Sequence, residues 1–267
     1  MVKIKGYSKL ISNYYSIKKY HDNLYKFTFH KFPVRNSEFE KANNIKMNRS
    51  RNVNDEKLDN HIARAKNKVF EYAACNEFDY FITLTLNKKK YDRYNLGKFI
   101  KDLGQMIRNY RRDFKVDIQY LLIPELHQDG AWHMHGLLKG LPIEHLELFT
   151  LEDNIPYKIK KMIKDGRKIY NWCKYADKFG WCTLEQVINQ EAVTKYITKY
   201  IRKSLNSDLK REKEKKLYYV SRGLKSAVKV KEGTINGQLT VPYEYENDYV
   251  KTKMLNGLDY LRLQNQL

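Results

Sequence analysis

The sequence predicts an α+β fold in which helices pack on a central antiparallel β-sheet. Three observations lead to this fold class. Strand-like and helical segments follow one another along the chain, two of the strands form a hairpin, and 267 residues suffice for one core with an appended lobe. We expect a basic, aromatic N-terminal arm over residues 1–55, a central domain over 56–230 and a C-terminal extension over 231–267.

The first elements are read from hydrophobic periodicity. Only one strand-like run, "NLYKFTFHKFP", is expected in the N-terminal arm, and Pro33 ends it. The segment "NDEKLDNHIARAKNKVFEYAACN" has apolar residues at helical spacing and predicts a helix that leads into the core. From Tyr80, "YFITLTLN" predicts a strand, and "NLGKFIKDLGQMIRNYRR" then predicts an amphipathic helix.

Two predicted strands, "IQYLLIPELH" and "WHMHGLLKG", form a hairpin through "QDGA". His133 and His135 share one face of the second strand, because strand side chains alternate with a period of two. A three-residue loop ending at Gly130 in the left-handed conformation places Glu125 opposite His133, whereas a two-residue Asp-Gly loop places Leu126 there. We favour the three-residue loop, because the alternative turns apolar side chains toward the histidines.

The remaining core elements are a strand and a helix. "GWCTLEQV" predicts the strand and "NQEAVTKYITKYIRKSLN" the helix. The tail "REKEKKLYYVSRGLKSAVKVKEG" is charged and then strand-like.

The charge balance points to a polyanionic partner. Lys and Arg number 51 against 31 Asp and Glu, for a net charge of +20, and 22 Tyr and 11 Phe are interleaved with the basic residues. This mixture suits phosphate neutralisation and base stacking, so nucleic acid is the expected partner. The alternative is that an AT-rich genome produces the abundance of Lys and Tyr.

The same composition bears on compartment. No apolar stretch has the length of a membrane span and the start of the chain lacks the apolar core of a signal peptide, so we expect a soluble, cytoplasmic protein. Cys75, Cys173 and Cys182 lack paired spacing and are expected to be ordinary reduced cysteines.

Two tyrosines in the last predicted helix carry candidate chemistry. Tyr196 and Tyr200 are four residues apart and share a helical face, and Lys199 and Lys203 each follow one of them by three residues. A tyrosine hydroxyl needs a nearby cation or metal to act as a nucleophile, and Lys199 can supply the cation. The alternative is a structural helix that packs its tyrosines on the sheet.

Three blocks in order, "FITLTLN", "PELHQDGAWHMHG" and "KYITKYIRK", resemble motifs one to three of the HUH endonucleases. The chain is most similar to the rolling-circle replication initiators of small bacterial phages and plasmids. The resemblance covers roughly residues 56–230, includes "YYVSRGLK", and implies an HUH/RRM-like palm. It also implies that Glu125, His133 and His135 hold a divalent metal, Mg²⁺ or Mn²⁺. It does not place His127, which we expect to be a surface residue.

The implied activity is metal-dependent nicking and strand transfer on single-stranded DNA at an origin. A tyrosine would form a 5′-phosphotyrosine bond and release a 3′-OH. Tyr196 and Tyr200 match the two-tyrosine members, and Tyr196 with Lys199 also matches the one-tyrosine form. Thr83 and Thr85 belong to motif one, where a plain strand role is at least as well supported as a contact to DNA.

Two other functions share these features. An HUH transposase would have the same catalytic residues, and a non-catalytic single-strand binder would use the histidines in a structural metal site. The sequence contains no G-x-x-x-x-G-K-[ST] motif, so unwinding is expected to need a host helicase, and a host polymerase would extend the 3′-OH.

Overall fold

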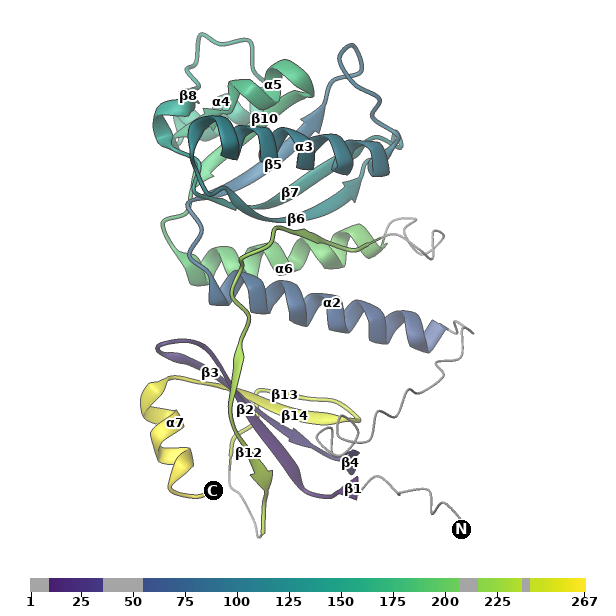
Figure 1. Cartoon of the computed structure of the whole chain (residues 1–267), viewed down its shortest axis with the longest axis vertical. Helices are drawn as coiled ribbons and strands as arrows, with labels where there is room; N and C mark the ends of the chain where they lie inside the picture. Colours follow the sequence, from purple (N-terminus) through teal and green to yellow (C-terminus); the bar gives the residue numbers. More distant parts are fainter. Residues whose placement is uncertain (1–9, 36–54, 207–215, 237–240) are drawn as a thin grey trace. The chain divides into compact units, whose positions relative to one another are not determined.

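The computed structural model describes residues 10–35, 55–206, 216–236 and 241–267, which belong to two compact units (Figure 1). Unit 1 combines residues 1–54 with 226–267, and unit 2 spans 55–225. No helix in the described ranges has both the length and the apolar character needed to cross a membrane.

Unit 1 is built on a five-stranded antiparallel sheet with the order β12-β2-β3-β14-β13. Its elements are β2 (Tyr14–His21), β3 (Leu24–His30), β12 (Val228–Thr234), β13 (Tyr245–Glu246), β14 (Val250–Leu255) and helix α7 (Gly257–Gln264), beside a small pair formed by β1 (Leu10–Ile11) and β4 (Val34–Arg35). Because β12 pairs with β2, the sheet combines segments that the sequence analysis assigned to separate parts of the chain.

The prediction of a single strand in the N-terminal arm was wrong, because β2 is a strand as well. Its side chains alternate at first, with Tyr15 and Ile17 buried. The pairing register with β3 then shifts between Lys19 and His21, and Tyr20 is also buried. This irregularity breaks the period of two from which a strand is recognised in a sequence.

Unit 2 contains a seven-stranded antiparallel sheet with the order β11-β6-β7-β5-β10-β9-β8. The strands are β5 (Tyr80–Leu86), β6 (Gln119–Leu126), β7 (Trp132–Lys139), β8 (Glu147–Leu148), β9 (Ile169–Asn171), β10 (Gly180–Gln186) and β11 (Tyr219–Val220). The helices are α2 (Asp55–Cys75), α3 (Leu96–Phe114), α4 (Tyr157–Lys164), α5 (Cys173–Lys178) and α6 (Gln190–Asn206), with a 3₁₀ turn at Ile143–His145. The predicted α+β fold with an antiparallel sheet and helices is confirmed.

Helices cover both faces of this sheet, with α3 on one side and α2 and α6 on the other (Figure 1). The predicted apolar stripe of α3, including Phe99 and Leu103, packs on the strand side chains that alternate with the site residues. On the other face, Ile197 of α6 and Val69 of α2 are fully buried against Leu137 of β7. Burying one such side chain contributes roughly 1.5–3 kcal/mol, so this cluster anchors α6 on the sheet.

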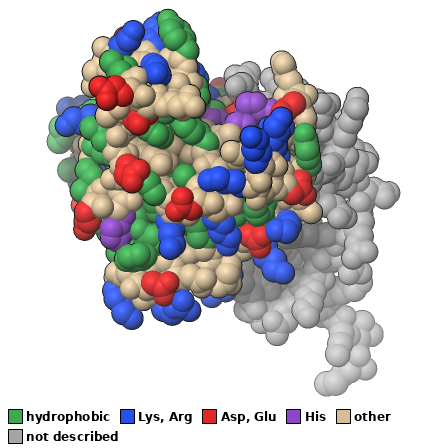
Figure 2. All heavy atoms as spheres, turned by 90° about the horizontal axis from the view of Figure 1, so that it is seen from above, with side chains coloured by type: hydrophobic (Ala, Val, Ile, Leu, Met, Phe, Trp, Pro, Cys, Tyr) green, Lys and Arg blue, Asp and Glu red, His purple; other side chains and the backbone are tan. Residues whose placement is uncertain are grey.

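The excess positive charge is not concentrated on every surface. On the face seen in Figure 2, Lys and Arg side chains lie interspersed with Asp, Glu and apolar ones. A surface of mixed sign attracts a polyanion less than a one-sign patch does. A nucleic-acid surface is therefore to be sought on other faces of the molecule.

Candidate active site

The β6–β7 hairpin brings the predicted metal ligands to one face of the sheet. Gly130 has a φ of 80°, and the backbone N–H of His127 donates to the carbonyl oxygen of Ala131, which closes a three-residue loop. Glu125 pairs with His133 in the strand register. The three-residue loop and its register are therefore confirmed, and Glu125 shares its face with His133 and His135.

Both histidine rings are held through their Nδ1 atoms by threonines of β5. Thr83 pairs with His135 in the register and Thr85 pairs with His133. Each threonine Oγ1 lies 3.1 Å from the Nδ1 of its histidine. Such a hydroxyl can donate to a bare Nδ1 or accept from a protonated one, so it orients the ring in either tautomer.

His135 is also bonded on its other nitrogen. Its Nε2 lies 2.7 Å from Oε2 of Glu125, and the exposed fractions of the two side chains are 13% and 11%. The carboxylate thus reaches past its direct register partner to the diagonal neighbour. His135 is fixed on three sides, because the ring of Tyr200 stacks on it with a centroid distance of 4.1 Å.

His127 lies beside His133 at the mouth of the site. Their rings are stacked with centroids 3.6 Å apart, although His127 itself is exposed. Burial lowers the pKa of His133 from 6.5 to about 4, and repulsion from a charged His127 or His135 lowers it further. His133 is therefore a neutral imidazole at neutral pH, the form in which nitrogen can ligate a metal.

Helix α6 presents its two tyrosines to this histidine cluster. The hydroxyl oxygens of Tyr196 and Tyr200 lie 2.9 Å apart, and Phe81 of β5 contacts both rings. Tyr196 is 47% exposed, whereas Tyr200 is partly buried under the histidine face. Burial raises the pKa of Tyr200 well above 10, and its hydrogen bond to Tyr196 and the charge of Glu125 raise it further.

The lysines near the tyrosines are placed differently. Lys199 is exposed and is not among the residues that line the cavity. The side chain of Lys203 lies outside the described part of the chain. The catalytic role expected for Lys199 therefore stays a prediction.

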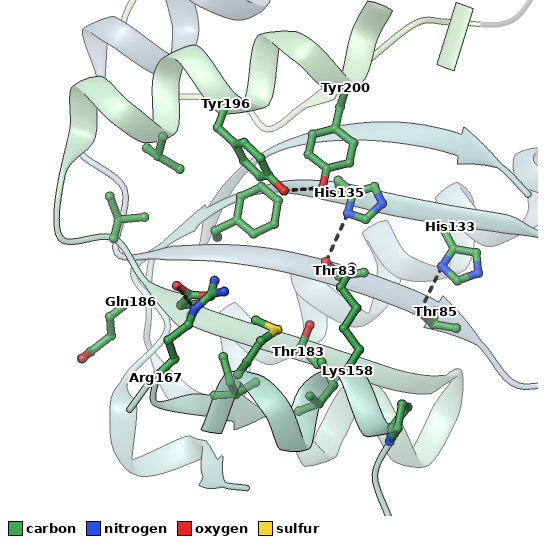
Figure 3. Close-up of a pocket in the computed structure, with 18 of the residues that line it drawn as sticks. Thr83, Thr85, His133, His135, Lys158, Arg167, Thr183, Gln186, Tyr196 and Tyr200 are labelled. Atoms are coloured by element: carbon green, nitrogen blue, oxygen red, sulfur yellow. Dashed lines mark hydrogen bonds and ion pairs between the residues drawn. The ribbon is translucent and has the colours of Figure 1, made fainter. Parts of the chain in front are cut away.

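A cavity of about 960 Å³ opens in front of the tyrosines and histidines. Its opposite wall is formed by α4, β9 and β10 (Figure 3). Lys158 of α4 faces the cavity there, and Arg167 forms an ion pair with Glu185 of β10. The cavity has the size of a small-ligand site and is bordered by cations, so it can receive a phosphate-bearing segment.

The donor set fits a divalent ion in its chemistry. Two neutral imidazoles and one carboxylate leave coordination positions open, as in catalytic rather than structural sites. Among the described residues, however, no group of three or more His, Cys, Asp or Glu side chains is positioned to hold a metal as it stands. The reason is local, since Nε2 of His135 is already bonded to Glu125. The predicted Mg²⁺ or Mn²⁺ site requires this hydrogen bond to open.

Several site residues carried no clear signal in the sequence. Thr83 and Thr85 look like ordinary β-branched strand residues, and only the pairing of β5 with β7 shows that they contact the histidines. Lys158 and Arg167 lie in the connecting region before β10, for which no element was predicted. Their place at the cavity comes from the packing of α4 and β9, which periodicity does not reveal.

An antiparallel sheet that carries a His, Glu and Tyr cluster over an open cavity defines a candidate phosphoryl-transfer site. Residues 79–205, just under half of the 267-residue chain, match the family model of the replication-associated protein ORF2 family. The matched segment contains β5, the β6–β7 hairpin and α6, and it supports a replication initiator. Comparison with curated proteins and with solved structures gives no match.

Proposed function

We propose that this protein is an HUH-type replication initiator that cleaves and rejoins single-stranded DNA in rolling-circle replication. The observation that carries the proposal is the meeting of α6 with the hairpin. Two tyrosine hydroxyls 2.9 Å apart face the cavity beside His135, which Tyr200 contacts directly. The family match over residues 79–205 supports a role in replication.

Tyr196 is the proposed first nucleophile. It is 47% exposed on the cavity wall, whereas Tyr200 is held by its stack on His135. The Tyr196 oxygen attacks the scissile phosphorus, a new P–O bond forms to the tyrosine, and the bond from phosphorus to the 3′ oxygen breaks. The phenol releases one proton and the leaving oxygen takes one up, so a 3′-OH and a 5′-phosphotyrosine result.

Tyr200 is the proposed second nucleophile. Its hydroxyl lies within hydrogen-bond distance of the first, so a small shift of α6 or a rotamer change brings it to the same phosphate. Two nucleophiles allow the enzyme to cut a second time while the first strand end is still attached. Rejoining is the reverse attack of a 3′-OH on the phosphotyrosine.

Glu125, His133 and His135 are the proposed ligands of Mg²⁺ or Mn²⁺, which would polarise the scissile phosphate as a Lewis acid. The chain's own residues orient this set, since Thr83 and Thr85 hold the two rings. Lys158 and Arg167 on the facing wall are placed to hold the DNA backbone. The 3′-OH is the primer for a host polymerase, and a host helicase would supply unwinding.

The test is capture of the covalent adduct. The full chain is incubated with an origin-derived single-stranded oligonucleotide and Mn²⁺, and the products are separated by denaturing electrophoresis. We expect Tyr196→Phe and Tyr200→Phe each to retain some single cleavage and the double variant to form no adduct. Tyr94→Phe, at a tyrosine that is 60% exposed outside the cavity lining, is the matched control.

Peptide mapping of the trapped adduct assigns the nucleophile. An adduct on Tyr196 in the wild-type first nick supports the assignment, and an adduct solely on Tyr200 reverses the order. Adduct formation by the double variant removes α6 from the chemistry. Binding without any adduct in the wild-type protein would identify a single-strand binder instead of a nickase.

A further inference from the structure

Three lysines lie in a row across neighbouring strands of the unit 1 sheet. Lys18 of β2 pairs in the register with Lys26 of β3 on one side and with Lys229 of β12 on the other (Figure 1). Adjacent strands are about 4.8 Å apart, so the row crosses about 10 Å of the sheet. Like charges directly opposite one another cost free energy, and an anion bound over them removes that cost.

This row lies on the face opposite the hydrophobic core of unit 1. Ile17 and Phe27, the neighbours of Lys18 and Lys26 in sequence, are fully buried in that core. Helix α7 packs on the core face, where Tyr260 stacks on Tyr25 at a centroid distance of 4.2 Å. The three lysines, which we call the lysine face together with Ser16 and Thr28 between and beside them, are partly exposed or exposed.

One acidic residue moderates the row without cancelling it. Glu232 of β12 pairs in the register with Ser16 and forms an ion pair with Lys229. It also accepts a hydrogen bond from the hydroxyl of Tyr14. Lys18 and Lys26 form the remaining cationic part of the row.

The polar groups of the lysine face suit phosphates better than bases. Lys, Ser and Thr are typical phosphate contacts and carry no base specificity. The large aromatic side chains of β2 and β3 that could stack on bases, Tyr15, Tyr25 and Phe27, point into the core. Single-strand binding relies on such stacking, whereas duplex DNA presents phosphates outward and keeps its bases stacked inside.

We infer that the lysine face is a second DNA-binding surface, distinct from the cavity of unit 2, and that it holds the phosphate backbone of duplex DNA. It needs no catalytic residue and does not depend on the proposed function. A protein that nicks one strand in unit 2 would use it to hold the adjoining duplex without reading its sequence.

The test compares two variants of the full chain with the same change in charge. Lys18→Gln/Lys26→Gln removes the middle of the row, and Lys101→Gln/Lys174→Gln removes two exposed lysines from α3 and α5. Binding of a fluorescent duplex of about 25 base pairs, without an origin sequence, is followed by anisotropy over a range of salt concentrations, chosen to span several Debye lengths. The same titration with oligo-dT of equal length tests single strands.

We expect Lys18→Gln/Lys26→Gln to weaken duplex binding roughly tenfold near physiological salt and to make the log–log salt slope shallower by about 1.8, or 0.9 for each lost phosphate contact. Lys18→Arg/Lys26→Arg keeps both charges and should retain binding, and a thermal melt shows that each variant is folded. Nicking of a single-stranded oligonucleotide should be unchanged in all variants.

Equal losses in the two Gln variants would show that only net charge matters and would overturn the inference. A loss confined to oligo-dT would also overturn it, because the face would then hold single strands. Failure of nicking in the wild-type chain would count against the proposed function while leaving the duplex titration interpretable.

Discussion

Replacing Thr83 by Val tests whether the β5 threonines position the histidines. Valine keeps the β-branched shape and loses only the hydroxyl, which lies 3.1 Å from Nδ1 of His135. His135 has a side-chain exposure of 13%, so water replaces the missing partner poorly. An unsatisfied group of this kind costs about 1–2 kcal/mol of folding stability.

The effect on metal binding should be larger than that on a bystander threonine. Loss of an outer hydrogen bond to a ligating histidine reduces metal affinity by about 10- to 100-fold, or about 1.4–2.8 kcal/mol. Thr83→Ser retains the hydroxyl and should rescue most of the loss. Thr183→Val is the matched control, because Thr183 pairs with Thr83 on the adjacent strand and lines the same cavity.

The assay is titration calorimetry of Mn²⁺ into the chelator-treated protein, with thermal unfolding measured alongside. Equal Mn²⁺ affinities for Thr83→Val and Thr183→Val would refute the positioning role. Absence of Mn²⁺ binding in the wild-type protein would refute the metal site itself, and the stability difference between the two variants would still test the hydrogen bond.

Three further predictions concern the hairpin. Glu125→Ala should weaken Mn²⁺ binding in calorimetry more than His127→Ala does, and the reverse order would make His127 the third ligand. Because the folded pKa of His133 is lowered to about 4 from 6.5, the unfolded chain takes up the proton first; in chelator, urea unfolding should show stability falling by about 1–2 kcal/mol, after allowance for partial exposure, as pH drops from about 6.5 to about 4. That fall should flatten in His133→Asn. Gly136→Ala should destabilise unit 2 by at least about 1–3 kcal/mol in the same assay, because an added Cβ would lie 2.3 Å from a backbone carbonyl oxygen of the neighbouring strand; Gly97→Ala, where the nearest neighbouring atom would be 3.7 Å away, should not.

Much of the site's local geometry was predictable from the residues alone. The three-residue loop of the hairpin follows from Gly130, and the loop length in turn places Glu125 beside the histidines. The shared face of Tyr196 and Tyr200 follows from the helical period, and the structure joins their hydroxyls by a hydrogen bond. These features depend on neighbours within about ten residues, where backbone periodicity is decisive.

Unit 1 shows where local patterns fail. Strand β2 was missed because an irregular register interrupts its alternation, and its partner β12 comes from more than 200 residues away in the chain. Nothing in either segment specifies that pairing. The lysine face exists only because the two segments meet in one sheet.

By itself, the sequence determined the α+β class, most strands and helices of the central domain, and the faces on which His133, His135 and the two tyrosines lie. These properties depend on the periods of two and 3.6 residues, which are local. Only the tertiary structure decided that β5 lies between β7 and β10, so that Thr83 meets the ring of His135 across 52 residues of chain. It also decided that α6 packs its tyrosines over the hairpin and that α4 closes the far wall of the cavity. The physical reason is that strand order and helix docking are set by the burial of the whole apolar surface, to which every segment contributes at once.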